Sequence, residues 1–117
     1  MTLSELLEEL KATDPENELE ISDITLNLDQ WSAPYKDDII QGRIQRACER
    51  RGWTWCIYKQ TPEEKKSHYA EISEIGPGYD GDYYNQYHES CIAGKEADTA
   101  AEALLAAYIA AVKEEKR

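Results

Sequence analysis

The first residues alternate between hydrophobic and polar positions with the period of an α-helix. Thr2-Leu3-Ser4-Glu5 matches a capping box, in which the Thr2 side chain and the Glu5 side chain each accept a hydrogen bond from the other's backbone N–H. Leucines follow at positions 3, 6, 7 and 10, which lie on one face of a helix. We predict a first helix that ends near Ala12, because Asp14-Pro15-Glu16-Asn17 interrupts the pattern.

A second helix is predicted to begin at Ser32-Ala33-Pro34 and to end at Gly52. Proline is well tolerated in the first turn of a helix, and glycine is a common residue just after the last turn. Four residues of this segment fall on one face: Ile40, Ile44, Ala47 and Cys48. Residues 18–32, which precede this helix, alternate between apolar and polar positions and are predicted to form extended chain or a short strand.

After Gly52 the apolar period changes from that of a helix to that of a strand. The two faces of the first predicted strand differ: Trp53, Trp55 and Ile57 alternate with Thr54, Cys56 and Tyr58. A second strand is predicted over residues 68–75, and a third over residues 83–93 with Gly94 at its end. The glycine- and proline-rich residues 76–82 between them predict a loop.

The last part of the chain contains the strongest helix signal. Thr99-Ala100-Ala101-Glu102 is a second capping box, and residues 100–115 are rich in alanine and leucine. A wide apolar stripe runs along this segment: Leu104, Leu105, Tyr108, Ile109 and Val112. The alanines beside this stripe allow the helix to approach a sheet closely.

This order of elements predicts an α+β fold, because the strands are grouped together with helices on either side in the sequence. We expect an antiparallel three-stranded sheet packed by helices, with an acidic N-terminal helix and a long alanine-rich C-terminal helix. The 117 residues suit one domain, with residues 1–30 as an acidic segment and residues 33–117 as an α-β-β-β-α core. Whether residues 1–30 pack on this core or on a partner stays open.

The formal net charge of −11 restricts the class of partner. An acidic surface repels phosphate backbones, so we expect no direct nucleic-acid partner. No apolar run reaches the roughly 18 residues that are needed to span a membrane, so we expect no membrane partner. It favours a protein with a basic surface, or serves solubility alone. The odd number of cysteines, none at CxxC spacing, and the lack of a signal-peptide pattern predict a reducing, cytoplasmic location.

The sequence shows no motif for catalysis or metal binding. GxGxxG, P-loop and GxSxG patterns do not occur. His88 and Cys91 lie three residues apart, so a regular strand would point them to opposite faces, and Cys56 has no neighbour that would stabilise a thiolate. We therefore expect no catalytic residue, no metal and no cofactor, and we do not expect an enzyme.

Two clusters are candidate binding residues. The first is the tyrosine- and aspartate-rich loop, whose composition resembles that of antibody paratopes: Tyr79, Asp80, Asp82, Tyr83, Tyr84 and Tyr87. The alternative is that these tyrosines only pack on a strand. The second cluster is on one face of the second helix: Arg43, Arg46 and Arg50. Its alternative is an ordinary solvated face. A pocket that combined both clusters would suit a nucleotide-like ligand.

Residues 34–112 resemble the phage ABA sandwich domain family. Two segments carry the resemblance: Cys48-Glu49-Arg50-Arg51-Gly52-Trp53-Thr54-Trp55, and Thr99-Ala100-Ala101-Glu102-Ala103-Leu104-Leu105-Ala106-Ala107-Tyr108. In that family a helix turns into a sheet through an Arg-Gly-Trp-like sequence, and a capped alanine-rich helix closes the domain. The chain departs from the family in its acidic leading helix and its tyrosine-rich loop. The resemblance implies a three-layer fold and a phage or prophage origin, and it transfers no activity.

These observations predict a non-enzymatic, phage- or prophage-encoded binding protein. Acidity and the aromatic loop favour an acidic inhibitor of a host protein with a basic surface, such as a defence protein or a nucleic-acid-binding protein, in the host cytoplasm. The alternative is a protein that sequesters a small molecule, such as a nucleotide signal. The sequence leaves open whether the chain forms a homo-oligomer.

Overall fold

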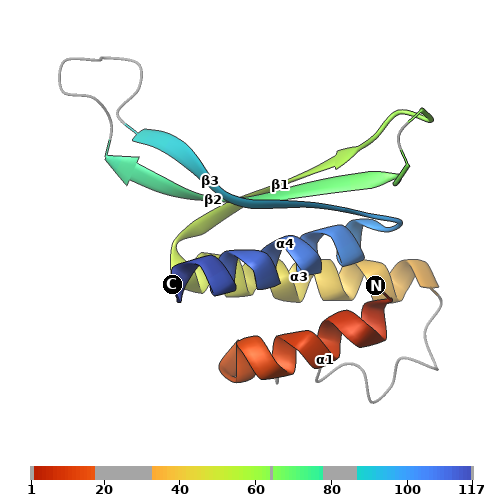
Figure 1. The fold of residues 1–117 in the computed structure, drawn as a ribbon, viewed down its shortest axis with the longest axis horizontal. Helices are drawn as coiled ribbons and strands as arrows, with labels where there is room; N and C mark the ends of the chain where they lie inside the picture. The colour runs from red at the N-terminus through yellow and green to blue at the C-terminus, as the bar shows by residue number, and fades with distance from the viewer. Residues whose placement is uncertain (1, 18–32, 64, 78–86, 117) are drawn as a thin grey trace.

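The computed structural model describes residues 2–17, 33–63, 65–77 and 87–116. It contains six labelled elements (Figure 1): α1 (Leu3–Thr13), α3 (Ala33–Arg51), β1 (Trp53–Lys59), β2 (His68–Pro77), β3 (Tyr87–Ala97) and α4 (Ala100–Glu115). The predicted α+β class is confirmed, as are the capping box at Thr2 and Glu5 and the N-cap at Thr99. Gly52 has a φ of 74°, a left-handed conformation that suits glycine and ends α3 where predicted.

The three strands form one antiparallel sheet in the order β1-β2-β3. Both α3 and α4 lie on the same face of this sheet, and α1 lies on the far side of the helix pair (Figure 1). The described residues therefore form three layers in the order sheet, helix pair, single helix.

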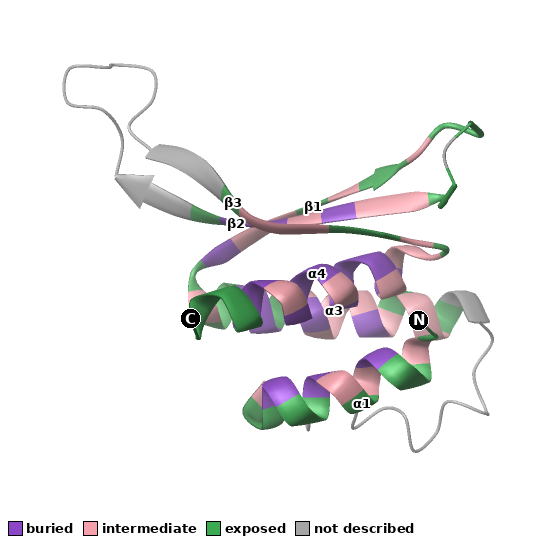
Figure 2. Cartoon of the chain, in the orientation of Figure 1, coloured by how far each residue is buried: buried purple, intermediate pink, exposed green. Residues whose placement is uncertain are grey.

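The core lies between the sheet and α4, where buried residues from both gather (Figure 2). The face of α3 that the sequence predicted to be apolar is fully buried: Ile40, Ile44, Ala47 and Cys48. Tyr108 of α4 is also fully buried, and its ring meets the edge of Trp53 at a centroid distance of 5.9 Å. The predicted aromatic face of β1 thus packs against the helices.

Two predicted boundaries are wrong. The third strand continues past Gly94 to Ala97, although we predicted that this glycine ends it. The second strand continues through Gly76 and Pro77, which we had placed in the loop. The physical reason at Gly94 is that the ring of Tyr69 on β2 covers it, so the strand gains a packing contact that glycine itself lacks. The predicted segment over residues 18–32 lies outside the described residues.

Helix α1 belongs to the domain, which answers the open question for the residues that the structure describes. Leu6 and Leu10 are buried in the main core cluster. Lys113 of α4 donates to the carboxylate of Glu9, and Lys116 donates to the backbone oxygen of Thr13. The amphipathic pattern of the first residues therefore serves packing on α4.

A buried polar cluster joins the end of α1 to α3 and α4. The Tyr108 hydroxyl donates to Oδ2 of Asp14 at 2.6 Å, and Nδ2 of Asn17 donates to the same oxygen at 2.9 Å. Arg51 approaches this oxygen through Nη2 at 3.1 Å and donates from Nε to the Tyr108 hydroxyl at 3.0 Å. Its Nη1 also pairs with Glu115 at 2.6 Å. The Asp14 side chain is only 6% exposed, so the cluster neutralises a carboxylate that is largely shielded from water.

The pH dependence of stability is expected to report this cluster. Burial acts to raise the pKa of Asp14, but the hydrogen bonds from Tyr108 and Asn17 and the charge of Arg51 outweigh it and hold the pKa below its usual value. A lowered pKa in the folded state contributes stability above the unfolded pKa, and this contribution is lost as the pH falls through the folded pKa. Urea unfolding at neutral and acidic pH should show this loss, and Asp14→Asn should reduce it. An equal loss in Asp14→Asn would contradict the assignment.

Candidate functional site

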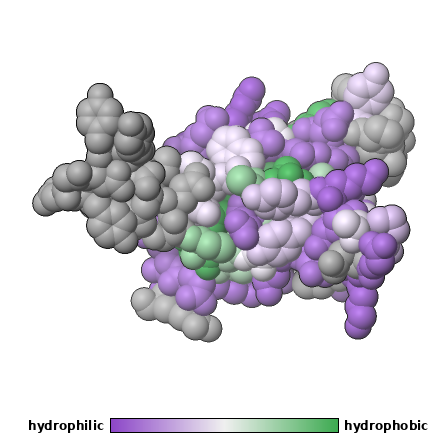
Figure 3. Space-filling model, turned by 90° about the horizontal axis from the view of Figure 1, so that it is seen from above, coloured by the Kyte–Doolittle hydropathy of each residue, from purple (hydrophilic) through white to green (hydrophobic). Residues whose placement is uncertain are grey.

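The face of the sheet that points away from the helices is the clearest candidate surface. The strand register places nine described positions there, three from each strand: Thr54, Cys56, Tyr58, Tyr69, Glu71, Ser73, Cys91, Gly94 and Glu96. We call these nine positions the open face, because none of the helices in the described ranges covers it (Figure 1). Figure 3 views the molecule from this side and shows pale and green residues among hydrophilic ones.

Two tyrosines form an aromatic pair at one end of the open face. Tyr58 and Tyr69 are direct partners on β1 and β2, and their rings stack with a centroid distance of 6.3 Å and an interplanar angle of 24°. Tyr58 is 51% exposed. The Tyr69 hydroxyl donates to Oε1 of Glu71 at 3.1 Å. Burial and this hydrogen bond raise the pKa of the Tyr69 phenol.

Gly94 fixes the position of the Tyr69 ring. A Cβ atom at Gly94 would lie 2.1 Å from the Tyr69 hydroxyl oxygen, which is far inside contact distance. The ring of Tyr69 therefore lies across β3 only because residue 94 has no side chain. Together with the bond to Glu71, this contact holds one ring of the aromatic pair in a defined orientation.

Substituting Gly94 by alanine is expected to displace Tyr69 and to separate the aromatic pair. Stability should change by less than about 1 kcal/mol, because alanine suits a strand at least as well as glycine and the displaced ring end is flexible. The nuclear Overhauser contacts between the Tyr58 and Tyr69 rings should disappear from the NMR spectrum. Gly42→Ala is the control, since a Cβ there meets nothing within 4 Å. Retained ring contacts in Gly94→Ala would contradict this role.

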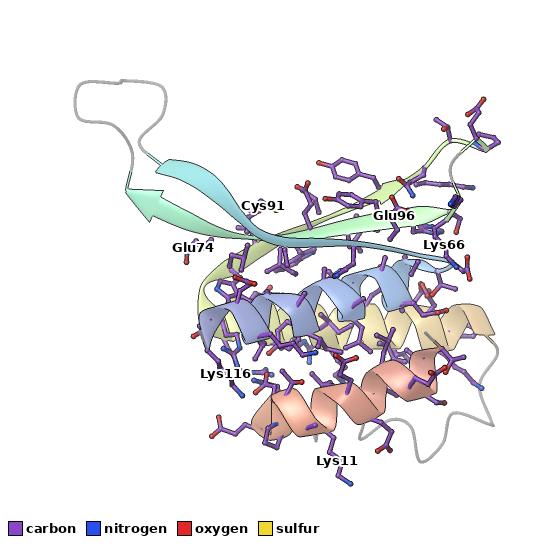
Figure 4. The ribbon with its side chains drawn as sticks, in the orientation of Figure 1. Lys11, Lys66, Glu74, Cys91, Glu96 and Lys116 are labelled. Carbon is purple, nitrogen blue, oxygen red and sulfur yellow. The ribbon has the colours of Figure 1, made fainter. Side chains whose placement is uncertain are left out.

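The open face is negatively charged. Glu71 is the partner of Cys56 and Gly94, and Glu96 is the partner of Tyr69. The nine described positions include no lysine or arginine. Glu96 and Cys91 both extend from β3 on this side of the sheet (Figure 4). A cation that approached the tyrosine pair would therefore meet two carboxylates on this face.

The first predicted binding cluster, the tyrosine- and aspartate-rich loop, lies almost wholly outside the described residues. These are Tyr79, Asp80, Asp82, Tyr83 and Tyr84. Its last member, Tyr87, is the first residue of β3.

The arginine cluster lies on α3, on the other side of the sheet from the open face (Figure 1). Arg46 is exposed and Arg43 is half-buried. Arg50 donates from Nε and Nη2 to Oδ1 of Asn17, at 3.2 Å and 2.7 Å. The structure therefore gives Arg50 a role in holding the residues after α1, and it does not bring the arginines to the open face.

A pocket of about 350 Å³ lies between α1, α4 and the end of β3. Its walls include Leu6 of α1, Lys66 of the β1–β2 turn, and β3 residues 95–97. Alanines of α4 form part of its floor. Arg43, Arg46 and Arg50 do not line it, and the described part of its lining includes no aromatic side chain.

The cysteines differ in their surroundings. All three are free. Cys56 and Cys91 are exposed on the open face, whereas Cys48 is buried and burial raises the pKa of its thiol to about 12.

Within the described ranges, no group of three His, Cys, Asp or Glu side chains is arranged to hold a metal ion. No helix among the described residues is long and apolar enough to span a membrane.

Sequence reasoning did not single out the tyrosine pair. The alternation in residues 53–58 placed Tyr58 opposite the tryptophans, which is correct. Tyr69, Glu71 and Glu96 acquire their common position only through the register of three strands. The alternation of each strand was the available signal, but it does not tell which residues become neighbours.

Comparisons with known proteins assign no family to the chain. No protein-family model matches it, and neither a curated protein nor a solved structure matches it. The resemblance to the phage ABA sandwich family therefore stays a prediction. The functional argument rests on the geometry of the described residues.

Proposed function

We propose that the chain is a non-enzymatic binding protein whose open face docks onto a basic surface of another protein. One observation supports this most: the stacked Tyr58 and Tyr69 lie beside carboxylates on a sheet face that no described helix covers. Antiparallel sheets often leave one face to solvent, but such a face usually carries scattered polar residues. A fixed aromatic pair on it provides contact area for a partner.

The aromatic pair suits recognition of a lysine or arginine side chain. A cation over the face of a tyrosine is attracted by the ring, and this attraction strengthens when water is removed. Tyr69 is already held by Gly94 and Glu71, so little conformational freedom is lost when a partner binds. Tyr58, which is more exposed, presents the accessible ring.

Charge complementarity favours a basic partner over a neutral one. The chain carries a net charge of −11, and the described part of the open face contributes carboxylates without bases. Such a field accelerates encounter with a positive surface and makes binding weaken with salt. With the phage resemblance, the proposal extends to a host protein of the cytoplasm, in defence or nucleic-acid binding, which this chain would inhibit.

Binding of an arginine-rich peptide tests the proposal. At low ionic strength, isothermal titration should detect binding, and the largest NMR shift changes should map to Tyr58, Tyr69 and their neighbours. The double variant Glu71→Gln/Glu96→Gln should weaken binding by about tenfold. The matched control is Glu8→Gln/Glu16→Gln, which removes the same charge from exposed positions of the N-terminal segment.

Tyrosine variants separate the aromatic contribution from charge. Tyr58→Ser should weaken peptide binding severalfold. Tyr35→Ser is its control, because Tyr35 is a comparably exposed tyrosine on α3. Equal effects in the open-face variants and their controls would mean that the peptide senses only overall acidity. That result, or no binding at low salt, would contradict the proposal.

The pocket at α1 and α4 favours a second candidate, the binding of a small molecule. A volume of about 350 Å³ is in the range of small-molecule sites. The nucleotide signal predicted from the sequence relied on an arginine and on the tyrosine loop, of which residues 78–86 lie outside the described residues. The described lining contains no arginine, and its cations are lysines.

A further inference from the structure

The floor of the pocket is apolar because α4 presents small residues there. Ala106 and Ala110 are one helical turn apart, and Ile109 lies between them. Leu6 of α1 and Ala97 of β3 add apolar surface on two sides. Larger side chains at the two alanines would fill this space. The hollow therefore follows from the alanine-rich sequence of α4.

Two ion pairs join residues of the pocket lining. Lys113 of α4 pairs with Glu9 of α1. Lys66 in the β1–β2 turn pairs with Asp98, just after β3, at 3.3 Å. Lys66 lies at the end of the sheet where the pocket is (Figure 4). These pairs use two of the lysines and two of the acids that line the pocket.

The two remaining acids of the lining, Glu102 and Glu96, make contacts elsewhere. Oε1 of Glu102 accepts a hydrogen bond from the Thr99 hydroxyl at 3.0 Å, and the Glu102 backbone N–H donates to Thr99 in the helix cap. Glu96 is the register partner of Tyr69, so its side chain belongs to the open face. Neither carboxylate serves as a partner for a lysine of the pocket among the described residues.

Lys95 is left as the pocket cation without a partner among the described residues. It is the register partner of the buried Ala70, which places its side chain on the helix side of β3. It lines the pocket together with both ion pairs and is exposed. An ammonium group beside an apolar floor provides one anchoring charge and no more.

We propose that this pocket binds an amphipathic organic acid, with its carboxylate paired to Lys95 and its apolar body on the alanine floor. One available cation in a lining that also contains four carboxylates matches a monoanion and disfavours a polyphosphate, which the acids would repel. Glu96 is the described residue that belongs both to the pocket lining and to the open face, so the test of this proposal uses Lys95 and Ala106, which are not part of the open face.

Decanoate is the probe for this proposal. Titration followed by two-dimensional NMR should show saturable shifts at Ala106, Ile109 and Ala110. Lys95→Gln should weaken decanoate binding by about tenfold, the value of one charge-assisted hydrogen bond. Lys65→Gln is the matched control, since Lys65 is an exposed lysine that does not line the pocket, and it should bind as the unchanged protein does.

Two further measurements test the apolar floor and the anchoring charge separately. Ala106→Leu should abolish binding by filling the floor while leaving the thermal unfolding temperature close to that of the unchanged chain, because Ala106 is only half-buried. Decanol, which has the same apolar body and no charge, should bind at least tenfold more weakly than decanoate. Equal binding of decanol, shifts confined to the open face, or no binding of decanoate would each overturn the proposal.

Discussion

Replacing Arg51 by methionine is expected to lower the free energy of unfolding by about 3–5 kcal/mol. The guanidinium is the positive charge that faces the buried Asp14, and its removal leaves that carboxylate shielded from water without a counter-charge. Methionine keeps much of the contact with the Trp53 ring, whose centroid lies 5.0 Å from the guanidinium carbon. The loss therefore measures the uncompensated charge, and urea unfolding at neutral pH is the measurement.

Two comparisons establish the cause of this loss. Arg50→Met is the matched control, because Arg50 precedes Arg51 but bonds to Asn17 from an exposed position, and it should cost less than about 1 kcal/mol. Adding Asp14→Asn to Arg51→Met should recover part of the loss, since the amide carries no charge. A double variant that is as unstable as the sum of the single variants would contradict the pairing.

Leu10→Ala is expected to cost about 2–5 kcal/mol, the usual range for a large buried side chain that is truncated to alanine. Leu10 is fully buried and belongs to the main core cluster with residues of α4. Its loss would leave a cavity between the two helices that a packed interior fills poorly. The measurement is the free energy of unfolding from urea denaturation, followed by the circular dichroism of the helices.

Leu7→Ala is the control for Leu10→Ala. Leu7 is on the same helix but only partly buried against the core, so its truncation should cost about 1 kcal/mol. A cost below 1 kcal/mol for Leu10→Ala would mean that α1 does not dock as the structure shows. The acidic N-terminal helix would then be available to a partner, which is the reading that the sequence left open.

The parts of the fold that the sequence predicted correctly are those determined locally. Helix α3 carries its apolar face, its glycine stop and the change of period at Trp53 within consecutive residues. Helix α4 has its own cap at Thr99 and a continuous apolar stripe. Patterns of this kind depend on neighbours in the sequence, and tertiary contacts did not override them here.

The parts that the sequence did not predict depend on contacts between distant residues. From the sequence, Gly94 is predicted to end a strand. In the structure the strand continues through Gly94, where the ring of Tyr69 from the neighbouring strand covers it. The hydrogen bond between Tyr108 and Asp14 joins positions that are 94 residues apart, and no local sequence pattern predicts it. The tyrosine pair of the open face has the same origin, because strand register decides which side chains meet.

Helices cover one face of the sheet, and the other face is accessible in the part of the chain that the structure describes. The reactivity of the three thiols toward a water-soluble maleimide tests this claim, because Cys56 and Cys91 lie on the open face and Cys48 lies in the core. The native protein should label rapidly at Cys56 and Cys91 and remain unlabelled at Cys48 until it is unfolded in urea. Protection of Cys56 and Cys91 as strong as that of Cys48 in the native protein would contradict the claim.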